Sequence, residues 1–551
     1  MTDRIGSETT MRGGGMRSRI VSMVLLAVFG VIAVKGATVA MSGASEANGV
    51  STAFAETTQR ADIIDRNGEL LATSVTVYSV FADPRAMLDG AVVAQELATI
   101  LPELDVTAIT ERLNNKERAF VWIQRGLTPR QRQAVFELGL EGIGFREEAR
   151  RSYPRGTLAG HVLGYTGIDG NGLSGVELAM EDRLSEGGKP LALTLDSNVQ
   201  FSLEAELSAA AGLYEAEGAA GIVMRASTGE VMAMASWPPL DPNRATSIHK
   251  DAPERLDRAS GAVFELGSVF KPLTVAGAID SGAIRPSDKF DVRDPLIIRG
   301  RTISDDHPIA GRASVTEIVS ESSNIGTVKV AWQMGARRQQ ELFTKLGLLE
   351  RAPIQLAASE RPILPTEFDD LNSAVTSYGH GIAVTPIAFT AAFAALANAG
   401  EYNAPTLILD DKTRTEPRRV LSAPTAALVT HMMRQAVITG TGKQAEVAGY
   451  RIAGKTGTAE KPIPGGYSET DNICSFAALF PADGPEYVVL IVLDNPKAGT
   501  DRGRTAAWNA APTAGRVIER IAPILGVEPR FDTLPQSGPQ VRSVSDRRSD
   551  M

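Results

Sequence analysis

One apolar segment near the N-terminus most constrains how this chain of 551 residues folds. Residues 20–41 are apolar or small apart from Lys35, and Arg12, Arg17 and Arg19 precede them. A segment of this length spans a bilayer if Lys35, near its outer end, extends to the lipid headgroups. Because the arginines lie on its N-terminal side, we expect residues 1–19 to form a cytoplasmic tail and everything after the anchor to fold beyond the membrane.

A cleaved signal peptide is the alternative interpretation of this segment. Read strictly, residues 20–34 have only signal-peptide length, and Ala53-Phe54-Ala55 is a small-residue stretch of the kind that signal peptidase cuts. That stretch lies roughly twenty residues beyond the apolar run, much farther than a cleavage site normally does. The distance favours an uncleaved anchor.

Composition excludes several classes of function. The net charge of −9 gives no reason to expect a nucleic-acid partner. The single cysteine, Cys474, cannot form an internal disulfide, and its apolar neighbours predict a small buried side chain rather than a nucleophile. The five histidines form no metal-binding motif with each other or with the cysteine, so we expect no metal, no cofactor and no histidine base.

The first half of the chain after the anchor is predicted to form a separate domain, residues 60–215, behind a linker at residues 42–59 that is rich in small and polar residues. Ile63–Leu71 reads as strand, turn and strand, with the turn at Asn67-Gly68. Residues 75–82 favour a further strand and residues 86–140 favour helices. Glycine-rich turns dominate residues 156–175.

A second domain is predicted at residues 216–530. Residues 219–235 read as a hairpin, residues 474–480 and 487–494 as strands, and residues 506–525 as a closing helix. Residues 531–551 are polar and predict a disordered tail.

Three short motifs in this second domain carry the chemistry. In chain order they are Ser268-Val269-Phe270-Lys271, Ser322-Ser323-Asn324 and Lys455-Thr456-Gly457-Thr458. Each motif alone is weak, because such short patterns occur by chance. The three in this order, each in a suitable local context, form a strong signal.

Ser268 is the predicted nucleophile. Pro272 is tolerated only in the first turn of a helix, so the apolar run that follows predicts a helix beginning at about Ser268. Lys271 then lies on the same helix face, and the helix N-terminus favours negative charge developing at the serine. A buried lysine whose pKa is lowered by burial and by a like charge, such as Lys455, can take the serine proton.

The other two motifs predict the surroundings of that nucleophile. The hydroxyl of Ser322 and the amide of Asn324 suit proton relay and substrate hydrogen bonding, although capping of a helix is the simpler interpretation for this cluster alone. Lys455 can attract a substrate carboxylate, and Gly457 at a strand edge lets a ligand backbone approach closely.

Two competing motifs fail. Residues 439–444, Thr-Gly-Thr-Gly-Lys-Gln, lack the first glycine of a phosphate-binding loop and the hydroxyl residue after its lysine. No serine lies in a G-x-S-x-G sequence, which argues against an α/β-hydrolase.

The sequence as a whole resembles a class B penicillin-binding protein, over nearly its full length. Beyond the three motifs, Arg60–Gly68 resembles the start of the family's non-catalytic pedestal, and Thr228–Ala235 its first catalytic hairpin. Arg146–Pro154 and Gly172–Glu177 look like the division-specific branch, the septal transpeptidases.

The resemblance implies a role for each site residue. Ser268 would be acylated, Lys271 would be its general base and Ser322 would relay the proton to the leaving group. Asn324 would hold the donor peptide, while Lys455, Thr456, Gly457 and Thr458 would bind its terminal carboxylate or that of a β-lactam. The backbone N–H groups of Ser268 and Thr458 would form the oxyanion hole. Members usually have proline where Leu266 stands, which implies a small change of loop.

The implied fold is α+β: a five-stranded antiparallel sheet flanked by helices, on an elongated, mostly β pedestal with one N-terminal transmembrane helix. The implied function is cross-linking of peptidoglycan stem peptides ending in D-Ala-D-Ala at the division septum, from the periplasmic side of the inner membrane. β-Lactam antibiotics and other cell-division proteins would be partners. The alternatives are a D,D-carboxypeptidase, an enzyme that hydrolyses or senses β-lactams, and a catalytically silent division scaffold.

Overall fold

The computed structural model describes residues 59–410, 415–497 and 504–531, together with Met23, Ala27, Gly30 and Lys35. The chain divides into two units, Met1–Thr58 and Gln59–Met551, and the second holds both predicted domains. The predicted cytoplasmic tail, nearly all of the predicted anchor and linker, and the tail after Phe531 lie outside the described residues. Among the residues that are described, no helix has the length and apolar character needed to cross a membrane.

The first sheet of the second unit is built on one long strand, β2. The strands are β1 (Ile63–Ile64), β2 (Leu70–Ala82), β3 (Val121–Leu127), β4 (Ile143–Ser152) and β5 (Leu191–Ala192). They run in the order β3-β2-β1-β5, with β4 also paired to β2. Gly68, with φ +87°, makes the predicted turn between β1 and β2. The sequence therefore predicted this hairpin correctly.

Helices pack beside these strands, and two expectations from the sequence are wrong for this domain. They are α2 (Gly90–Ile100), α3 (Val106–Asn114) and α4 (Pro129–Glu137). Residues 86–140 are not all helical, because Val121–Leu127 forms β3, pairs with β2 and buries Val121 and Ile123 in a shared core. Nor is this domain mostly β, since its helices cover the sheet and supply much of that core.

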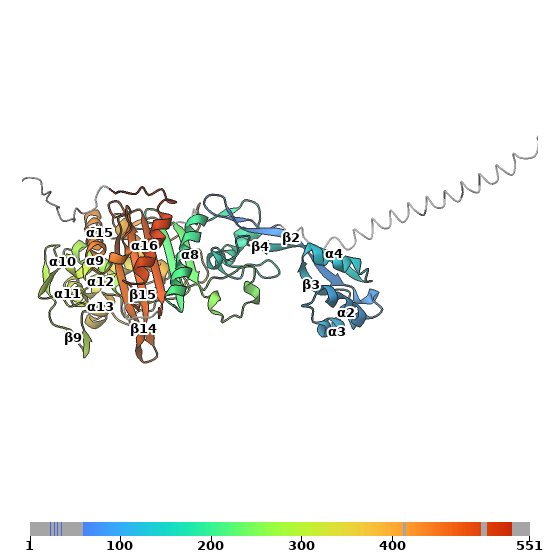
Figure 1. Ribbon diagram of the computed structural model, residues 1–551, viewed down its shortest axis with the longest axis horizontal. Coiled ribbons are helices and arrows are strands. Elements are labelled where there is room, and N and C mark those ends of the chain that lie inside the picture. Colours follow the sequence, from blue (N-terminus) through green and yellow to red (C-terminus); the bar gives the residue numbers. More distant parts are fainter. Residues whose placement is uncertain are drawn as a thin grey trace, which may run out of the picture. The chain divides into compact units, whose positions relative to one another are not determined.

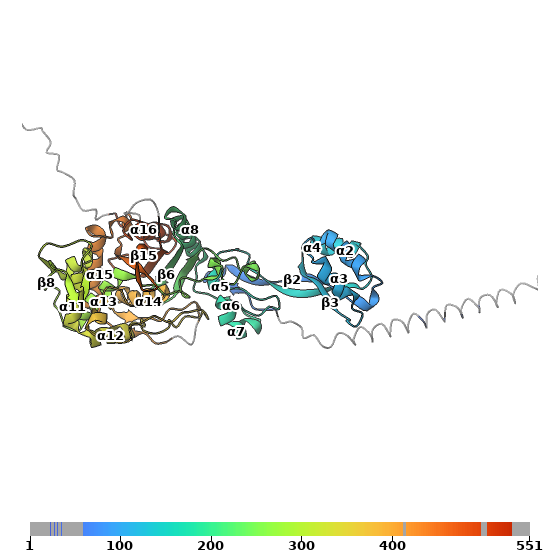
Figure 2. The same ribbon diagram turned by 90° about the horizontal axis from the view of Figure 1, so that it is seen from below.

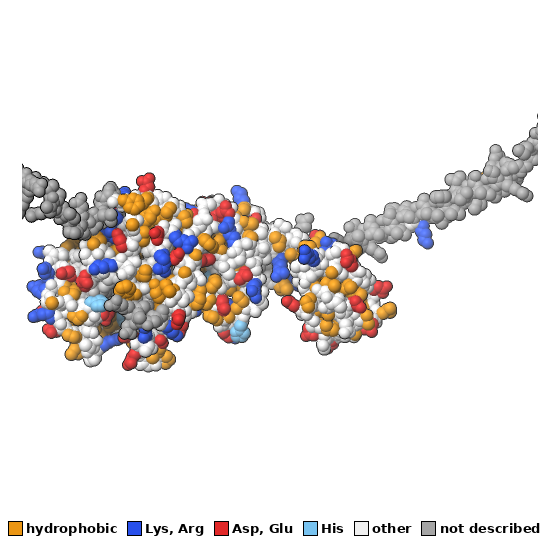
Figure 3. Space-filling model, viewed as in Figure 1, with side chains coloured by type: hydrophobic (Ala, Val, Ile, Leu, Met, Phe, Trp, Pro, Cys, Tyr) orange, Lys and Arg blue, Asp and Glu red, His pale blue; other side chains and the backbone are white. Residues whose placement is uncertain are grey.

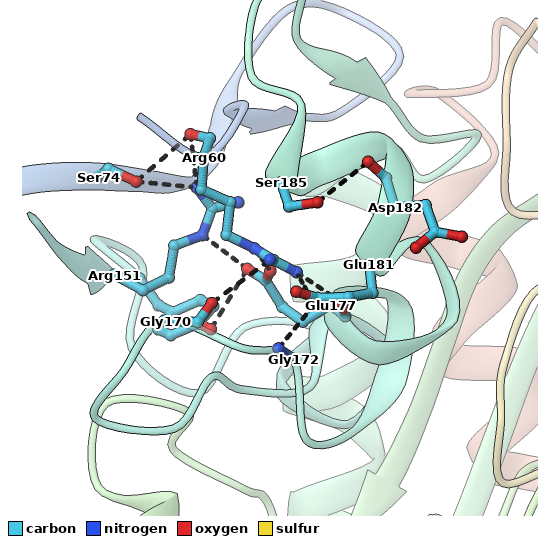
Figure 4. A network of polar contacts seen from close by, with 10 residues as sticks. Arg60, Ser74, Arg151, Gly170, Gly172, Glu177, Glu181, Asp182 and Ser185 are labelled. Atoms are coloured by element: carbon cyan, nitrogen blue, oxygen red, sulfur yellow. Dashed lines mark hydrogen bonds and ion pairs between the residues drawn. The ribbon is translucent and has the colours of Figure 1, made fainter. Parts of the chain in front are cut away.

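A buried ion-pair network connects this first sheet to the turns that follow β4 in the chain. Those turns hold the short helices α5 (Gly160–Leu163), α6 (Gly175–Ala179) and α7 (Glu181–Ser185). Glu177 in α6 is fully buried. Its carboxylate accepts hydrogen bonds from the Nε of Arg60 at 2.6 Å and from the Nε of Arg151 at 2.7 Å (Figure 4). Arg60 also pairs with Glu181 at 2.9 Å.

The second sheet has five antiparallel strands in the order β14-β15-β16-β6-β7, of which Figure 1 labels β14 and β15. Its strands are β6 (Gly218–Arg225), β7 (Val231–Trp237), β14 (Ala453–Ile463), β15 (Gly466–Phe480) and β16 (Tyr487–Asp494). The predicted hairpin is β6–β7, and the two later predicted strands are β15 and β16. The sheet therefore pairs β6, from the start of the domain, with β16, from near its end.

Helices cover both faces of this sheet. Alternate residues of β16 point to opposite sides, so Val489 and Ile491 join a core with α8 (Ser197–Leu213) and α16 (Ala510–Ile521), whereas Val488 and Leu490 join a larger core on the other face. Figure 2 places α8 and α16 above the sheet and α14 below it. The predicted closing helix at residues 506–525 corresponds to α16.

The larger core is built by helices from the middle of the chain. They are α9 (Lys271–Asp280), α10 (Val315–Ser320), α11 (Asn324–Met334), α12 (Ala336–Lys345), α13 (Asp370–Thr376), α14 (Pro386–Ala397) and α15 (Ala423–Ile438). Short strand pairs lie among them: β8 (Lys289–Asp291) with β11 (Arg312–Ser314), β9 (Leu296–Ile298) with β10 (Arg301–Ile303), and β12 (Glu401–Tyr402) with β13 (Arg418–Arg419).

Candidate active site

Ser268 lies in a tight turn that leads into a buried helix. The turn is a 3₁₀ helix over Gly267–Phe270, and α9 follows from Lys271 with Pro272 in its first turn. The α-helix thus begins three residues later than expected, while Ser268 and Lys271 still lie one turn apart. Ser268 is half-buried, so its hydroxyl borders the surface, whereas Lys271 is fully buried.

Lys271 is held by a residue of the second motif. Its Nζ donates hydrogen bonds to the backbone oxygen of Ser322 and, at 3.1 Å, to the Oγ of Ser322. Burial lowers the pKa of Lys271 to about 7, although the carboxylates of Asp305 and Asp306 oppose the shift. At neutral pH a substantial fraction of this amine is therefore free to accept a proton.

Lys455 approaches the same serine from the sheet. Its Nζ donates to the Oγ of Ser322 at 2.9 Å and to the backbone oxygen of Thr456 at 3.0 Å. The side chain is fully buried, and burial followed by the charge of Lys271 lowers its pKa. Ser322 itself has φ +66°, an uncommon conformation for a residue other than glycine. The hydroxyl of this residue is the point where the two lysines meet.

Ser323 and Asn324 have structural partners at the start of α11. The Oγ of Ser323 accepts from the N–H of Gly326 at 2.9 Å and donates to Asp305 at 2.6 Å, so Ser323 is the helix cap. The side-chain amide of Asn324 donates to the backbone oxygen of Ser304 at 2.8 Å and stays half-buried. Capping, which the sequence left open for this cluster, is thus present for Ser323.

Thr456, Gly457 and Thr458 lie on β14, at the edge of the sheet. Thr456 and Thr441 share a hydrogen bond of 2.8 Å between their hydroxyls, and the Oγ1 of Thr458 accepts from the N–H of Ala506 at 3.1 Å. Thr458 is half-buried, which leaves it nearer the surface than Lys455.

Gly457 lets the strand touch the turn that carries Ser268. A Cβ added to Gly457 would lie 2.2 Å from the backbone oxygen of Leu266. That oxygen also accepts from the Oγ of Ser475, on β15, at 2.9 Å. Leu266 is fully buried, and Gly267 after it has φ +62°. Leu266 therefore lies where the sheet packs tightly against the turn that carries Ser268.

Sequence reasoning missed Asp305, Thr441 and His380. Asp305 holds the start of α11 from the loop before α10, where no local pattern marks it. Thr441 belongs to the segment rejected as a phosphate loop, and the structure uses it to support Thr456. His380 is buried, and burial followed by the charges of Arg301 and Lys271 lowers its pKa to about 4, so it is neutral at pH 7.

The fold and the site together define a class of protein. A serine at a helix start, two buried lysines meeting at a second serine, and a sheet-edge K-T-G motif are the constellation of serine enzymes that react with penicillin. Residues 219–518 match the penicillin-binding protein transpeptidase domain, and residues 55–189 match the penicillin-binding protein dimerisation domain. The chain belongs to the penicillin-binding protein transpeptidase family.

Curated relatives and solved structures agree with this assignment. The chain is 41% identical over 485 residues to the probable peptidoglycan D,D-transpeptidase FtsI of Caulobacter vibrioides, covering 85% of this chain and 82% of the relative. It is 29% identical over 506 residues to the peptidoglycan D,D-transpeptidase FtsI of Escherichia coli K12, covering 86% and 84%. Penicillin-binding protein 3 of Mycobacterium tuberculosis, complexed with aztreonam, superposes with a TM-score of 0.68 and 26% identity over 86% of this chain and 98% of that one.

Proposed function

We propose that this protein is a septal peptidoglycan D,D-transpeptidase that works through an acyl-enzyme at Ser268. The observation that carries the proposal is the pair of buried lysines, Lys271 and Lys455, which meet at the Oγ of Ser322. Lys271 lies one helical turn from Ser268. Relatives named as peptidoglycan D,D-transpeptidases support the substrate, and relatives complexed with β-lactams support their binding.

Acylation begins with proton transfer from Ser268 to the neutral amine of Lys271. The serine oxygen attacks the carbonyl carbon between the two D-alanines of the donor, and the resulting oxyanion is stabilised by the N–H groups of Ser268 and Thr458. The C–N bond then breaks, and the leaving amine takes a proton through Ser322. The released D-alanine leaves the donor peptide esterified to Ser268.

Transfer reverses the direction of proton flow. An amine of a neighbouring stem peptide attacks the ester carbonyl and loses a proton to the lysine–serine pair, and Ser268 regains its proton as the new peptide bond forms. With a β-lactam, the same attack opens the ring, so no leaving group departs and the ester persists.

Recognition of the donor carboxylate is assigned to β14, with Asn324 holding the peptide backbone. Because Lys455 is fully buried, its charge acts through Ser322 and Thr456 rather than from the surface, while Thr458 is the residue near enough to the surface to contact the carboxylate. Thr456 and Gly457 keep this strand close to the Ser268 turn.

We propose the following roles for the domains and for the N-terminal segment. Residues 60–215 form an elongated non-catalytic pedestal, residues 216–530 the catalytic domain, and residues 20–41 a single anchor in the bacterial inner membrane, with the catalytic domain in the periplasm. An anchor suits a wall substrate, because it keeps the enzyme where precursors emerge. Division proteins in the same membrane are the expected partners. A mature form that begins near Glu56 in the soluble periplasmic fraction would contradict the anchor.

Labelling with a fluorescent penicillin tests the catalytic assignment. Ser268→Ala should abolish the covalent label, whereas Ser281→Ala, at the other end of α9, should be labelled like the wild type. Labelling of Ser268→Ala at the normal rate would refute the nucleophile. An unlabelled wild type would favour a silent scaffold, and an adduct that hydrolyses within seconds would favour a β-lactamase.

A further inference from the structure

A cavity of about 600 Å³ lies in the part of the structure built on β2, far along the chain from the three motifs. Its walls are β2, β3 and β4, the loop at residues 165–173 and the segment at residues 242–255. Four arginines line it: Arg125, Arg150, Arg151 and Arg255. Glu148 is the acidic residue among the lining side chains. Figure 3 shows Lys and Arg side chains on the face where β2 and β4 lie.

Two of these arginines have no acidic partner among the described residues. Arg125 pairs with Glu148 at 2.8 Å and with Asp169 at 2.7 Å. The guanidinium of Arg255 donates, within the same part of the chain, to uncharged groups, which are the hydroxyl of Tyr165 and two backbone oxygens. Arg150 is exposed, and its side chain has no hydrogen bond or ion pair within the described part of the chain. The cavity wall therefore carries an excess of positive charge.

Arg151 adds positive charge behind this wall. Its side chain is 2% exposed, and its Nε is paired with Glu177. Its Nη2 has no hydrogen-bond partner among the residues that the structure describes, and it is closed to solvent. A ligand carboxylate in the cavity would feel the charge of Arg151 without touching that nitrogen. Figure 4 shows Arg151 and Arg60 converging on Glu177, so this carboxylate cannot turn to the free nitrogen without losing a partner.

Other residues that line the cavity are apolar or aromatic and can pack against apolar side chains of a ligand. Val77, Tyr153 and Leu173 line the cavity beside the arginines, and Ile168 is 68% exposed at its rim. The volume lies within the range of sites that enclose small ligands or short peptide segments. Arginine forms its strongest pairs with planar carboxylates, which it can hold through two parallel bonds.

We propose that this cavity binds an acidic peptide segment, with carboxylates facing Arg150 and Arg255. Apolar side chains of the segment would rest on Val77 and Leu173. This site is separate from the catalytic centre, and the proposal stands whether or not Ser268 is the nucleophile.

The test uses the full-length protein in detergent and the fluorescent peptide acetyl-Glu-Leu-Glu-Leu-amide, followed by anisotropy. The matched neutral peptide has glutamine in place of each glutamate. We expect the acidic peptide to bind at least about tenfold more tightly than the neutral one. Arg150→Glu should remove that preference, whereas Arg130→Glu, an exposed arginine of α4 that does not line the cavity, should keep it.

Thermal unfolding of both variants checks that each is folded before binding is compared. Equal binding of the two peptides, no binding of either, or an Arg150→Glu protein that binds like wild type would overturn the proposal. Displacement of the acidic peptide by sulfate at equal concentration would also overturn it, because the site would then select a bare anion rather than a peptide.

Discussion

Lys271 and Lys455 are both fully buried and donate hydrogen bonds to the same atom, the side-chain oxygen of Ser322. Two like charges this close repel each other, and burial disfavours both, so the pair titrates as a unit. Burial lowers the pKa of both lysines, and the charge of Lys271 lowers that of Lys455 further, so the pair can accept a proton near neutral pH. That property is needed next to a serine that must lose a proton.

The rate of acylation should rise with pH and then level off. Burial holds the pKa of Lys271 at about 7. Below that value the amine is protonated and cannot accept the proton of Ser268, so the rate should fall as the pH falls and level off above it. The measurement is the second-order rate constant for fluorescent penicillin between about pH 5.5 and 8.5. A flat profile would exclude Lys271 as the base.

Lys455→Ala should weaken acylation without abolishing it. The substitution removes a buried cation that bonds to Ser322 and Thr456, and losing one charge-assisted contact costs about 1.5–3 kcal/mol, or roughly ten- to a hundredfold in rate. Because Lys455 is buried, alanine also removes packing. Lys455→Met keeps the side-chain volume, so comparing the two variants separates the lost amine from the lost packing. If both variants acylate like wild type, the carboxylate role is wrong.

Gly457→Ala should disturb the nucleophile turn. The new methyl group would lie 2.2 Å from the oxygen of Leu266, so the strand or the turn must move, and a displacement of about 1 Å in an active site can cost roughly a hundredfold in rate. Gly466→Ala is the control, since a Cβ at this position of β15 meets no atom within 4 Å. Penicillin labelling of the two variants measures the difference, and equal rates would contradict the close contact.

Glu177→Gln should destabilise the protein far from the active site. Glu177 is fully buried between Arg60 and Arg151, and its replacement leaves Arg151 without a carboxylate and Arg60 with Glu181 alone. Breaking a buried pair of this kind costs about 3–5 kcal/mol. Urea unfolding followed by tryptophan fluorescence, to which Trp122 on β3 contributes, should show the loss, whereas exposed Glu186 changed to Gln should leave the midpoint unchanged.

The sequence predicted the parts of the fold that depend on local patterns. Pro272 marked the start of the helix after Ser268, and the strands of the second sheet were apolar enough to recognise. β3 was missed because seven residues between helices were read with their helical neighbours, and only pairing with β2 identifies them.

The site residues were predicted better than their contacts. Motif spacing indicated Ser268, Ser322 and Lys455, but not that one hydroxyl joins both lysines, because that meeting brings together three segments far apart in the chain. Asp305 was missed for a related reason, since its partners Ser323 and Ile325 lie in another element, beyond the reach of a local pattern. Long-range contacts of this kind leave no periodic trace in a single sequence.

The strand order of the catalytic sheet has a consequence for synthesis of the protein. β6 can pair on one side with β7 as soon as the hairpin is made, but its other partner, β16, is translated near the end of the chain. Until then an apolar hairpin has one open edge, and β14, with the lysine of the site, has no sheet to join. A ribosome that stops before Asp494 therefore releases an aggregation-prone fragment that cannot react with penicillin, and activity arises only with the last strand.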